Sequence, residues 1–450
     1  MKRLFYIIVC AMSGFSLQAQ FTLEKCQMLA REHYPLIKQY GLIEQSTAYS
    51  VANALKAYLP QVSFTAQTTY QNDVSAFPQQ MLSMYEMIGL NMKGLNKDQY
   101  RVALDVNQTI WDGGLTNAQK EAVKAEGIVS MQSVETELYT LHERINMLFF
   151  GLLILNEQLL QNDLLQALLQ SNYSTVEALI KNGVALPGDL QAIKAEQLTV
   201  LQQRIQVESA AKAYRTMLSV LIGQTIDDAT TFEKPSVSTV FYERITNYGS
   251  LTSDRNLVSL QGNAINVINR PELQLYEAQS DLFEAQKRSI IASTMPRIGF
   301  FAQGFYGNPG LNLFKDMTEN KWTWNFITGL YLQWNFGSFY TKKGSLQKLT
   351  LAQQQIDIRR ETFLYNTGLQ QIHQRQAIDK MRKMMADDDE IIFLRTSIRQ
   401  ASEAKFANGT ITVNELLRDI TTESQSQLAK SLHELEWLKN IYELKNTTNQ

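Results

Sequence analysis

The residues of this chain that could do chemistry are few and far apart. Its four histidines are His33, His142, His373 and His433. They show no metal-ligand spacing, which indicates ordinary surface or core positions. No glycine-rich phosphate loop, nucleophile elbow or HExxH motif occurs, and Cys26 has no histidine signal beside it. The sequence therefore predicts a protein that is not an enzyme, with no cofactor and no metal site.

A methionine cluster is the pattern that comes nearest to a metal site. Met81, Met84, Met87 and Met92 lie between two segments expected to be strands. Thioethers at such spacing can hold soft Cu(I). The alternative, which we favour, is a short loop helix whose methionine stripe packs on its neighbours.

A run of charges, KMRKMMADDDE at 380–390, places a basic turn before an acidic one on an expected helix. Lys383 and Asp387 are spaced as a helical ion pair, so a solvated helix face is the default interpretation. Contact with a partner protein is the alternative.

Two acidic residues follow two Asn-Gly pairs in the sequence. Asp189 comes two residues after Pro187, and Glu415 has capping-box spacing from Thr412. The helix dipole favours an anion in a first helical turn. Helix capping is therefore expected of both carboxylates, and it is compatible with a second role.

The start of the chain predicts export. Lys2 and Arg3, an apolar run and small residues near Ala19 form a secretory signal peptide at 1–19. Cys10 falls inside it, so Cys26 is the thiol that remains and no intrachain disulfide is possible. The net charge is −2 and the charged residues form no basic block, which argues against nucleic acid as a partner.

One plan occurs twice along the chain. Residues 33–71 realign on 269–308, with Pro35 matching Pro271 and Pro60 matching Pro296. This duplication predicts a first repeat at 20–223, a linker at 224–268 and a second repeat at 269–450.

Four segments have the period-two pattern of strands with one apolar and one polar face. They are residues 62–70, 101–111, 298–306 and 324–336. Beyond the signal, no run of 18 apolar residues could cross a bilayer as a helix. Each strand is long enough to cross about 30 Å of hydrocarbon when tilted. A membrane role would therefore use these strands, and a soluble sandwich is the alternative.

Each repeat also contains a very long helix that ends at an Asn-Gly pair. Residues 116–182 and 342–408 read as nearly unbroken helix, about 100 Å each at 1.5 Å per residue. Apolar residues from Met131 to Leu159 recur in steps of three and four, as in coiled coils. Asn182-Gly183 and Asn408-Gly409 supply the positive φ that a tight helix reversal needs.

The order of these features resembles the TolC-type outer membrane efflux family. The resemblance rests on LEKCQMLAREHYPLI, AYLPQVSF, VNQTIWDGG, the Asn-Gly turns and the duplication. It implies an α+β membrane protein: a homotrimer whose four strands per chain close a 12-stranded transmembrane β-barrel, continued by a long periplasmic α-helical coiled-coil tunnel. Four strands from one chain would otherwise leave edges in lipid.

The resemblance also assigns roles to the two turns. It implies a pore gate of acidic residues at Asp189 and Glu415, with Arg418 where the family has a second acid. The family's usual arginine after Gly-Thr is replaced by Ile411, so Arg418 would supply the cation from another place. The implied adaptor-binding tips are Asn182, Gly183, Asn408, Gly409 and Thr410.

The implied function is that of a passive exit duct of a tripartite efflux or type I secretion system. Its expected location is the cell outer membrane, in contact with lipid, with the helical part in the periplasm. Its expected partners are a periplasmic adaptor (membrane fusion) protein and an inner-membrane efflux pump or ABC transporter. The alternative is a secreted coiled-coil structural or adhesive protein without a pore, because heptads and a signal peptide fit that equally well.

Overall fold

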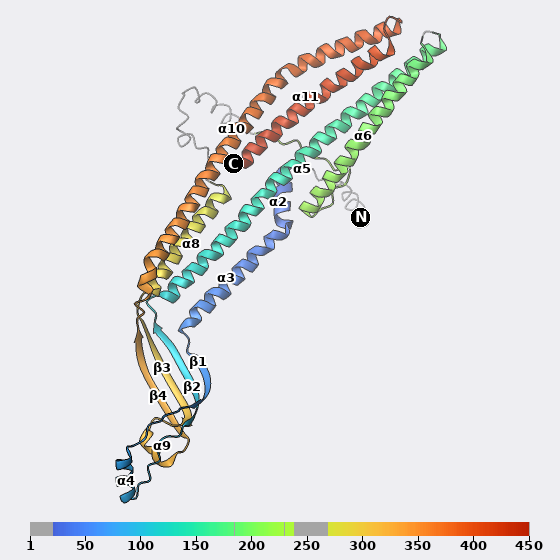
Figure 1. Cartoon of the computed structure of the whole chain (residues 1–450). Coiled ribbons are helices and arrows are strands. Elements are labelled where there is room, and N and C mark those ends of the chain that lie inside the picture. The colour runs from blue at the N-terminus through green and yellow to red at the C-terminus, as the bar shows by residue number, and fades with distance from the viewer. Residues whose placement is uncertain (1–20, 184, 229, 238–268, 450) are drawn as a thin grey trace, which may run out of the picture. The chain divides into compact units, whose positions relative to one another are not determined.

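The computed structural model describes residues 21–237 and 269–449, apart from positions 184 and 229 (Figure 1). The expected signal peptide and most of the expected linker lie outside these residues. The chain divides into two compact units, which are described separately. Unit 1 consists of Met1–Tyr40, Gln132–Leu275 and Arg359–Gln450, and unit 2 of Gly41–Met131 and Tyr276–Ile358.

The described chain is mostly helical, with a small antiparallel sheet. The elements up to residue 222 are α2 (Leu23–His33), η2 (Pro35–Lys38), α3 (Gln39–Leu55), η3 (Lys56–Tyr58), β1 (Gln61–Tyr70), α4 (Gln79–Met87), β2 (Asp98–Trp111), α5 (Leu115–Lys181) and α6 (Pro187–Ile222). Those from residue 271 are α8 (Pro271–Ser293), β3 (Arg297–Asn308), α9 (Leu313–Glu319), β4 (Thr323–Gln333), α10 (Ser338–Ala407) and α11 (Val413–Thr448). The order helix, strand, short helix, strand, long helix, shorter helix thus occurs twice. The repeat boundaries at 223 and 269 stay a prediction.

The two long helices predicted from the sequence are confirmed, with bounds within a few residues of those expected. α5 has 67 residues and α10 has 70. Within α5 the middle of the predicted heptad is buried, from Val134 through Ile145 to Leu152. α5 is also the one helix in the described part of the chain that is long and apolar enough, by length and composition, to cross a membrane, but half of its most apolar stretch is buried within the fold. A helix covered in this way is typical of a protein core.

The strands of unit 2 form one sheet in the order β1-β2-β3-β4, each antiparallel to the next. One row of the register runs Phe64, Leu104, Gly304, Phe326. Because side chains alternate across a strand, this register places every second residue of all four strands on one face.

The fourth strand is shorter than its sequence predicts. β4 ends at Gln333, whereas the apolar pattern extends to Phe336. The carbonyl of Asn335 accepts the Ser338 N–H at 3.3 Å, and its side chain accepts the Gly337 N–H at 3.0 Å. This turn removes the backbone from the strand, and Trp334 instead donates its indole N–H to the Thr294 carbonyl at 3.1 Å.

Unit 1 contains a core where α2, α5, α6 and α11 meet. Phe149, Phe150 and Ile145 of α5 are fully buried there, together with Cys26 of α2. Burial raises the pKa of the Cys26 thiol to about 12, so the thiol stays protonated and unreactive in the folded chain.

Two contacts within unit 1 join distant parts of the chain near the predicted repeat boundaries. At the first, Phe21 pairs with Phe232; the Phe21 N–H bonds the Thr231 carbonyl at 3.2 Å. At the second, the Asn449 side chain donates to the Asn269 carbonyl at 2.6 Å.

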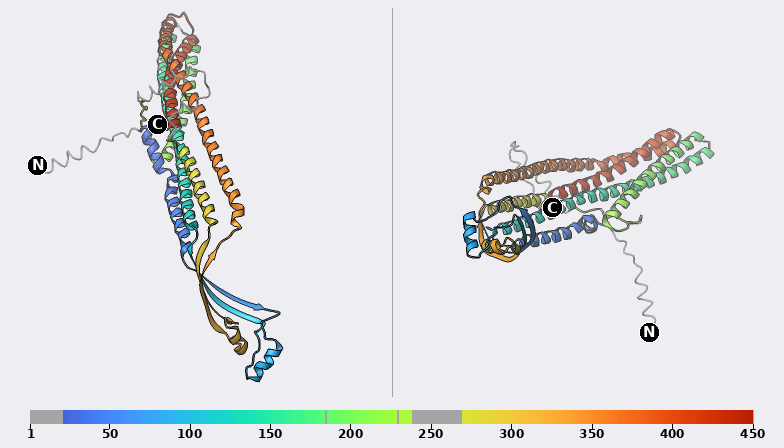
Figure 2. Two further views of the ribbon diagram at one scale, coloured as in Figure 1. Left: turned by 90° about the vertical axis from the view of Figure 1, so that its left-hand side faces the viewer. Right: turned by 60° about the horizontal axis from the view of Figure 1, so that its bottom comes forward.

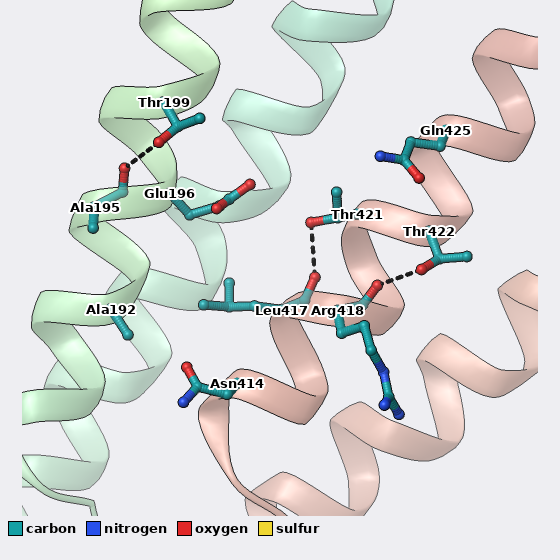
Figure 3. A pocket seen from close by; sticks show the side chains of 10 residues that line it. All are labelled: Ala192, Ala195, Glu196, Thr199, Asn414, Leu417, Arg418, Thr421, Thr422 and Gln425. Atoms are coloured by element: carbon teal, nitrogen blue, oxygen red, sulfur yellow. Dashed lines mark hydrogen bonds between the residues drawn. The ribbon is translucent and has the colours of Figure 1, made fainter.

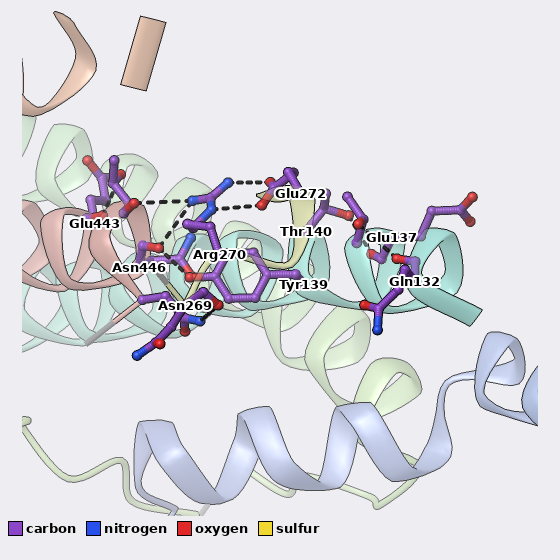
Figure 4. Close-up of polar contacts among 12 residues, drawn as sticks. Gln132, Glu137, Tyr139, Thr140, Asn269, Arg270, Glu272, Glu443 and Asn446 are labelled. Atoms are coloured by element: carbon purple, nitrogen blue, oxygen red, sulfur yellow. Dashed lines mark hydrogen bonds and ion pairs between the residues drawn. The ribbon is translucent and has the colours of Figure 1, made fainter. Parts of the chain in front are cut away.

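Arg270 binds the end of α11 beside that second junction. Its guanidinium pairs with Glu272, lies 4.7 Å from the centre of the Tyr139 ring, and donates to the Asn446 carbonyl at 3.3 Å (Figure 4). A cation at a helix C-terminus is favoured by the dipole and can bond the last carbonyls of the helix.

The charge run at 380–390 lies on α10, where one predicted pairing is wrong. Lys383 pairs with Asp379 at 2.7 Å rather than with Asp387. Both spacings are four residues, but Glu or Asp on the N-terminal side of the lysine is the better orientation. Asp388 and Asp389 instead contact His433 and Lys430 of α11, so part of the acidic turn joins two helices.

Candidate functional site

The first helix reversal has the geometry that its sequence predicts. α5 ends at Lys181, and Gly183 has a φ of 73°. The Gly183 N–H donates to the Ile180 carbonyl at 3.0 Å, and that of Asn182 to Ala178 at 3.2 Å. These bonds close the last turn of the helix in the manner of a left-handed C-terminal cap.

The second reversal repeats this arrangement between α10 and α11. Gly409 has a φ of 71°, and its N–H donates to Phe406 at 2.9 Å. Asn408 bonds the Ala404 carbonyl through its side chain at 2.8 Å, and the Thr410 hydroxyl bonds the Lys405 carbonyl at 2.9 Å. The backbones of both tips are thus fixed, while the side chains of Asn408 and Thr410 stay exposed.

We expect Gly183→Val to destabilise the first tip by about 1–2 kcal/mol, because an L side chain is strained at positive φ. The space around an added Cβ is open at Gly183, so no clash adds to the strain. Gly188→Val is the matched control, since Gly188 has equally open space and lies in α6 without positive φ. Protease cleavage at the tip should accelerate for the first variant only. Equal rates for the two variants would contradict the strain argument.

The two acidic residues of the predicted gate both cap helices. The Asp189 carboxylate accepts the Leu186 N–H at 2.9 Å at the start of α6. Thr412 and Glu415 form a reciprocal capping box at the start of α11, with both distances 3.3 Å. Glu415 is exposed and Asp189 is half-buried. The capping role expected from the sequence is therefore present, and a role in a pore stays a prediction.

Arg418 is one turn beyond Glu415 but does not pair with it within the described chain. Its side chain is 74% exposed, and its Nε lies 3.7 Å from Asp419. It lines an open groove of about 600 Å³ between α6 and α11 (Figure 3). Small residues such as Ala192 and Ala195 line the α6 side, and Thr421 and Thr422 the α11 side.

A buried core holds the four helix ends beneath the tips. It comprises Leu165, Leu169, Val176, Ile193, Val200, Phe406, Val413, Leu416, Leu417 and Ile420. Residues from α5, α6, α10 and α11 all contribute, so the two hairpins pack against each other in unit 1. Both views of Figure 2 show the four helix ends side by side.

A buried ion pair, missed by the sequence analysis, links α10 to α11. Arg399 contacts Glu423, whose side chain is 7% exposed, and also pairs with Glu403 at 2.6 Å. The Thr396 hydroxyl donates to Glu423 at 2.6 Å. Although burial disfavours the charge of Arg399, the bond to Glu403 and the charge of Glu423 raise its pKa. Nearer the tip, Ser402 donates to Asp419 at 2.6 Å.

The sheet in unit 2 has one apolar face that exposes many large side chains. Phe64, Phe326 and Leu330 are each at least 70% exposed, which is unusual for large apolar side chains on a folded chain. Aromatic side chains gather at one end of this face, where Tyr306 contacts Trp324 at 5.1 Å between ring centres. The other face carries polar residues: Gln303 bridges Arg101 and Asp105, and Thr65 donates to Asp105 at 3.2 Å.

Both edges of this sheet are unpaired within the described chain, because β1 and β4 are the outer strands. The helices attached to these edges also expose apolar residues seven positions apart. On α3 they are Leu42 and Tyr49, and on α10 Leu351 and Ile358, each at least 60% exposed. Seven-residue spacing is that of a coiled-coil seam.

The methionine cluster is only partly as predicted. The loop helix exists as α4, but its stripe does not pack on neighbours: Met81, Met84 and Met87 are 47%, 53% and 82% exposed. Met92 lies outside the helix. In the part of the chain that the structure describes, no group of three or more His, Cys, Asp and Glu could hold a metal ion.

Comparison with known proteins gives matches among solved structures. No family model matches the sequence, and no curated protein does. The structure is similar to that of CusC, with a TM-score of 0.66 at 13% identity over 96% of this chain and 92% of that one. It is also similar to the Neisseria gonorrhoeae MtrE outer membrane channel, with a TM-score of 0.61 at 14% identity over 95% and 88%. Vibrio cholerae VceC, an outer membrane protein, gives 0.61 at 13% identity over 95% and 94%.

Proposed function

From the fold that this chain shares with TolC-type outer membrane efflux channels, we propose that it is an outer membrane exit duct. The observation that carries the proposal is the sheet of unit 2, with its exposed apolar face, its polar face and its two unpaired edges. In lipid, unpaired backbone groups cost several kcal/mol each, so strands span a membrane only in closed barrels. The four strands of one chain need further copies to close.

We propose that three copies assemble, so that three times four strands form a 12-stranded barrel. β1 of one copy would pair with β4 of the next. The exposed residues on α3 and α10 support the same contact, because these helices continue from those two strands. The long helices would then continue the barrel as a periplasmic tunnel.

The proposed partners are a periplasmic adaptor at the helix tips and an inner-membrane pump or ABC transporter that drives transport. The tips Asn182-Gly183 and Asn408-Gly409-Thr410 support the adaptor contact, since their backbones are fixed and their side chains exposed. The channel itself would be passive and conduct its cargo to the outside.

Two measurements test the duct against the secreted coiled-coil alternative. Purified protein in detergent should be trimeric by light scattering and should change its gel migration on heating, as a folded barrel does. In planar bilayers it should give single-channel conductance. A rod without a pore would give neither heat-modified migration nor conductance.

We propose that Asp189 and Glu415 also form negative rings near the tunnel entrance. Three copies of each carboxylate around a narrow axis would attract cations. Asp189→Asn with Glu415→Gln removes the charges while leaving a side-chain oxygen for each cap.

We expect this double variant to reduce cation preference by about threefold and to raise leak through the resting channel. Glu44→Gln, at an exposed acid on α3, is the control and should leave both unchanged. Selectivity and leak like those of the wild type in the double variant would leave the two carboxylates as helix caps only.

A further inference from the structure

The two outer loops of unit 2 fold into one body. We define the loop knot as residues 71–97, which contain α4, and 309–322, which contain α9. The Lys93 N–H donates to the Met317 carbonyl at 2.8 Å, and the Asn320 side chain donates to Asn96 at 3.1 Å. Figure 1 shows α4 and α9 together beyond the ends of the strands. The loops are therefore a packed structure.

Aromatic contacts and a buried carboxylate join the parts of the knot. The Phe77 ring lies 5.5 Å from that of Tyr85 on α4 and 5.9 Å from that of Phe314 on α9. Asp316 is 2% exposed and accepts the Gly310 N–H at 2.6 Å. A buried carboxylate with a fixed backbone donor holds the start of the second loop in place.

The knot contacts both faces at the end of the sheet, and its second loop is bonded to the polar face. The Leu311 N–H donates to the Asn325 side chain at 2.9 Å. Asn325 is opposite Phe305 in the register, on the face that carries Arg101 and Gln303. At this end of the sheet Phe305 is only 4% exposed, with Arg101 stacked 4.0 Å above its ring. Trp322, the last residue of the knot, lies beside the apolar face, where its ring contacts those of Tyr100 and Tyr306.

The knot nonetheless exposes an apolar stripe on α4 and its C-terminus. Met81, Met84 and Ile88 are 47%, 53% and 67% exposed. At 100° per residue these three side chains fall within about 60° of one another, and Glu86 falls on the opposite side of the helix. Phe314 of α9 is also 67% exposed. Such a patch indicates a binding surface.

We propose that this stripe binds the same stripe of neighbouring copies of the chain. The inference rests on the proposed trimer with the polar face inward. The bond from Leu311 to Asn325 holds the second loop on the side of the inward face, where the knot would meet water and the other two knots, whereas lipid would cover the opposite face of the sheet. Three stripes in contact narrow the outer mouth of the barrel with thioether and aliphatic side chains. A hydrophobic constriction of this kind restricts ion flow by dewetting, and flexible methionine side chains can repack when cargo passes.

Cysteine cross-linking of the assembled protein tests the contact. Met84→Cys places a thiol in the stripe, and Glu86→Cys places one on the opposite side of the same helix. The native Cys26 is buried and should not react with the reagent. With a short bifunctional thiol reagent, we expect cross-linked dimers for Met84→Cys at about five times the yield for Glu86→Cys, because thiols react only when close and accessible.

The outcomes separate this contact from the proposed function. Equal or absent cross-linking in a preparation that light scattering shows to be trimeric overturns the docking alone. A monomeric preparation overturns the trimeric duct, and the docking with it. Quenching of a fluorophore on Met84→Cys by brominated lipid tails would identify lipid as the occupant and would also overturn the proposal.

Conductance supplies a second readout that does not depend on cross-linking. Met84→Ser with Ile88→Ser should raise the single-channel conductance of the resting trimer by about threefold, because water wets a polar constriction. Glu86→Ala is the control and should leave conductance nearly unchanged. Unchanged conductance in the double variant of a trimeric channel would overturn the constriction.

Discussion

We expect Phe64→Lys to prevent assembly of the proposed membrane barrel. Phe64 lies in the middle of β1, in register with Leu104, and is 70% exposed on the apolar face. A lysine facing lipid at the bilayer midplane costs about 2–4 kcal/mol in a membrane barrel. Three copies of the chain would each carry this cost.

The neighbouring residue gives a matched control for this substitution. Ser63 is also exposed, but it lies on the polar face opposite Asp105. Ser63→Lys should therefore assemble normally. Membrane fractionation and heat-modified gel migration measure the difference. Equal assembly of both variants would mean that the apolar face does not contact lipid, and the duct would lose its main support.

The second large effect is expected at the buried pair between α10 and α11. Glu423→Leu leaves the Arg399 guanidinium, which is 16% exposed, without its partner on the other helix. Removing one member of a buried pair typically costs about 3 kcal/mol or more. The pair with Glu403 on the same helix compensates in part. The midpoint of thermal loss of helicity should fall, and cleavage of the second tip by protease should accelerate.

Two further variants give this prediction its controls. Lys430→Met removes an exposed pair with Asp389 and should cost less than about 1 kcal/mol. Arg399→Met combined with Glu423→Leu replaces the pair by apolar groups, which should recover most of the stability. If Glu423→Leu unfolds no earlier than Lys430→Met, the buried pair does not hold the hairpin together.

The sequence predicted the parts of this fold that depend on local pattern. Period-two alternation located all four strands, and the heptads located α5 and its buried face, because one side of each element meets one environment. The Asn-Gly pairs gave the positions of Gly183 and Gly409 correctly, since positive φ is a local backbone demand.

Features that depend on long-range contact were not predictable in the same way. The Arg399–Glu423 pair needs the exact alignment of two helices across a turn, which periodicity leaves open. The end of β4 depended on the side chain of Asn335 competing for the backbone. The exposure of Met84 depends on which other segments pack against α4, and the sequence of α4 does not specify them. At the candidate gate, capping spacing identified the contacts of Asp189 and Glu415, but no local pattern tells which way a side chain faces in an assembly.

The matching layout of the two halves bears on how such a chain could arise. Phe21, at the predicted start of the first half, pairs with Phe232 beyond its predicted end, and Asn449 bonds Asn269 at the two ends of the second half. The same order of helices and strands occurs in both halves, which is the layout expected after tandem fusion of two copies of one gene. An ancestor with a single repeat would supply two strands per chain, and six such chains would build the same proposed ring. Fusion would have replaced sixfold by threefold symmetry and left the two tips free to diverge. The first tip now has Leu186 at the N-cap before Asp189, and the second has Thr412 at the N-cap before Glu415.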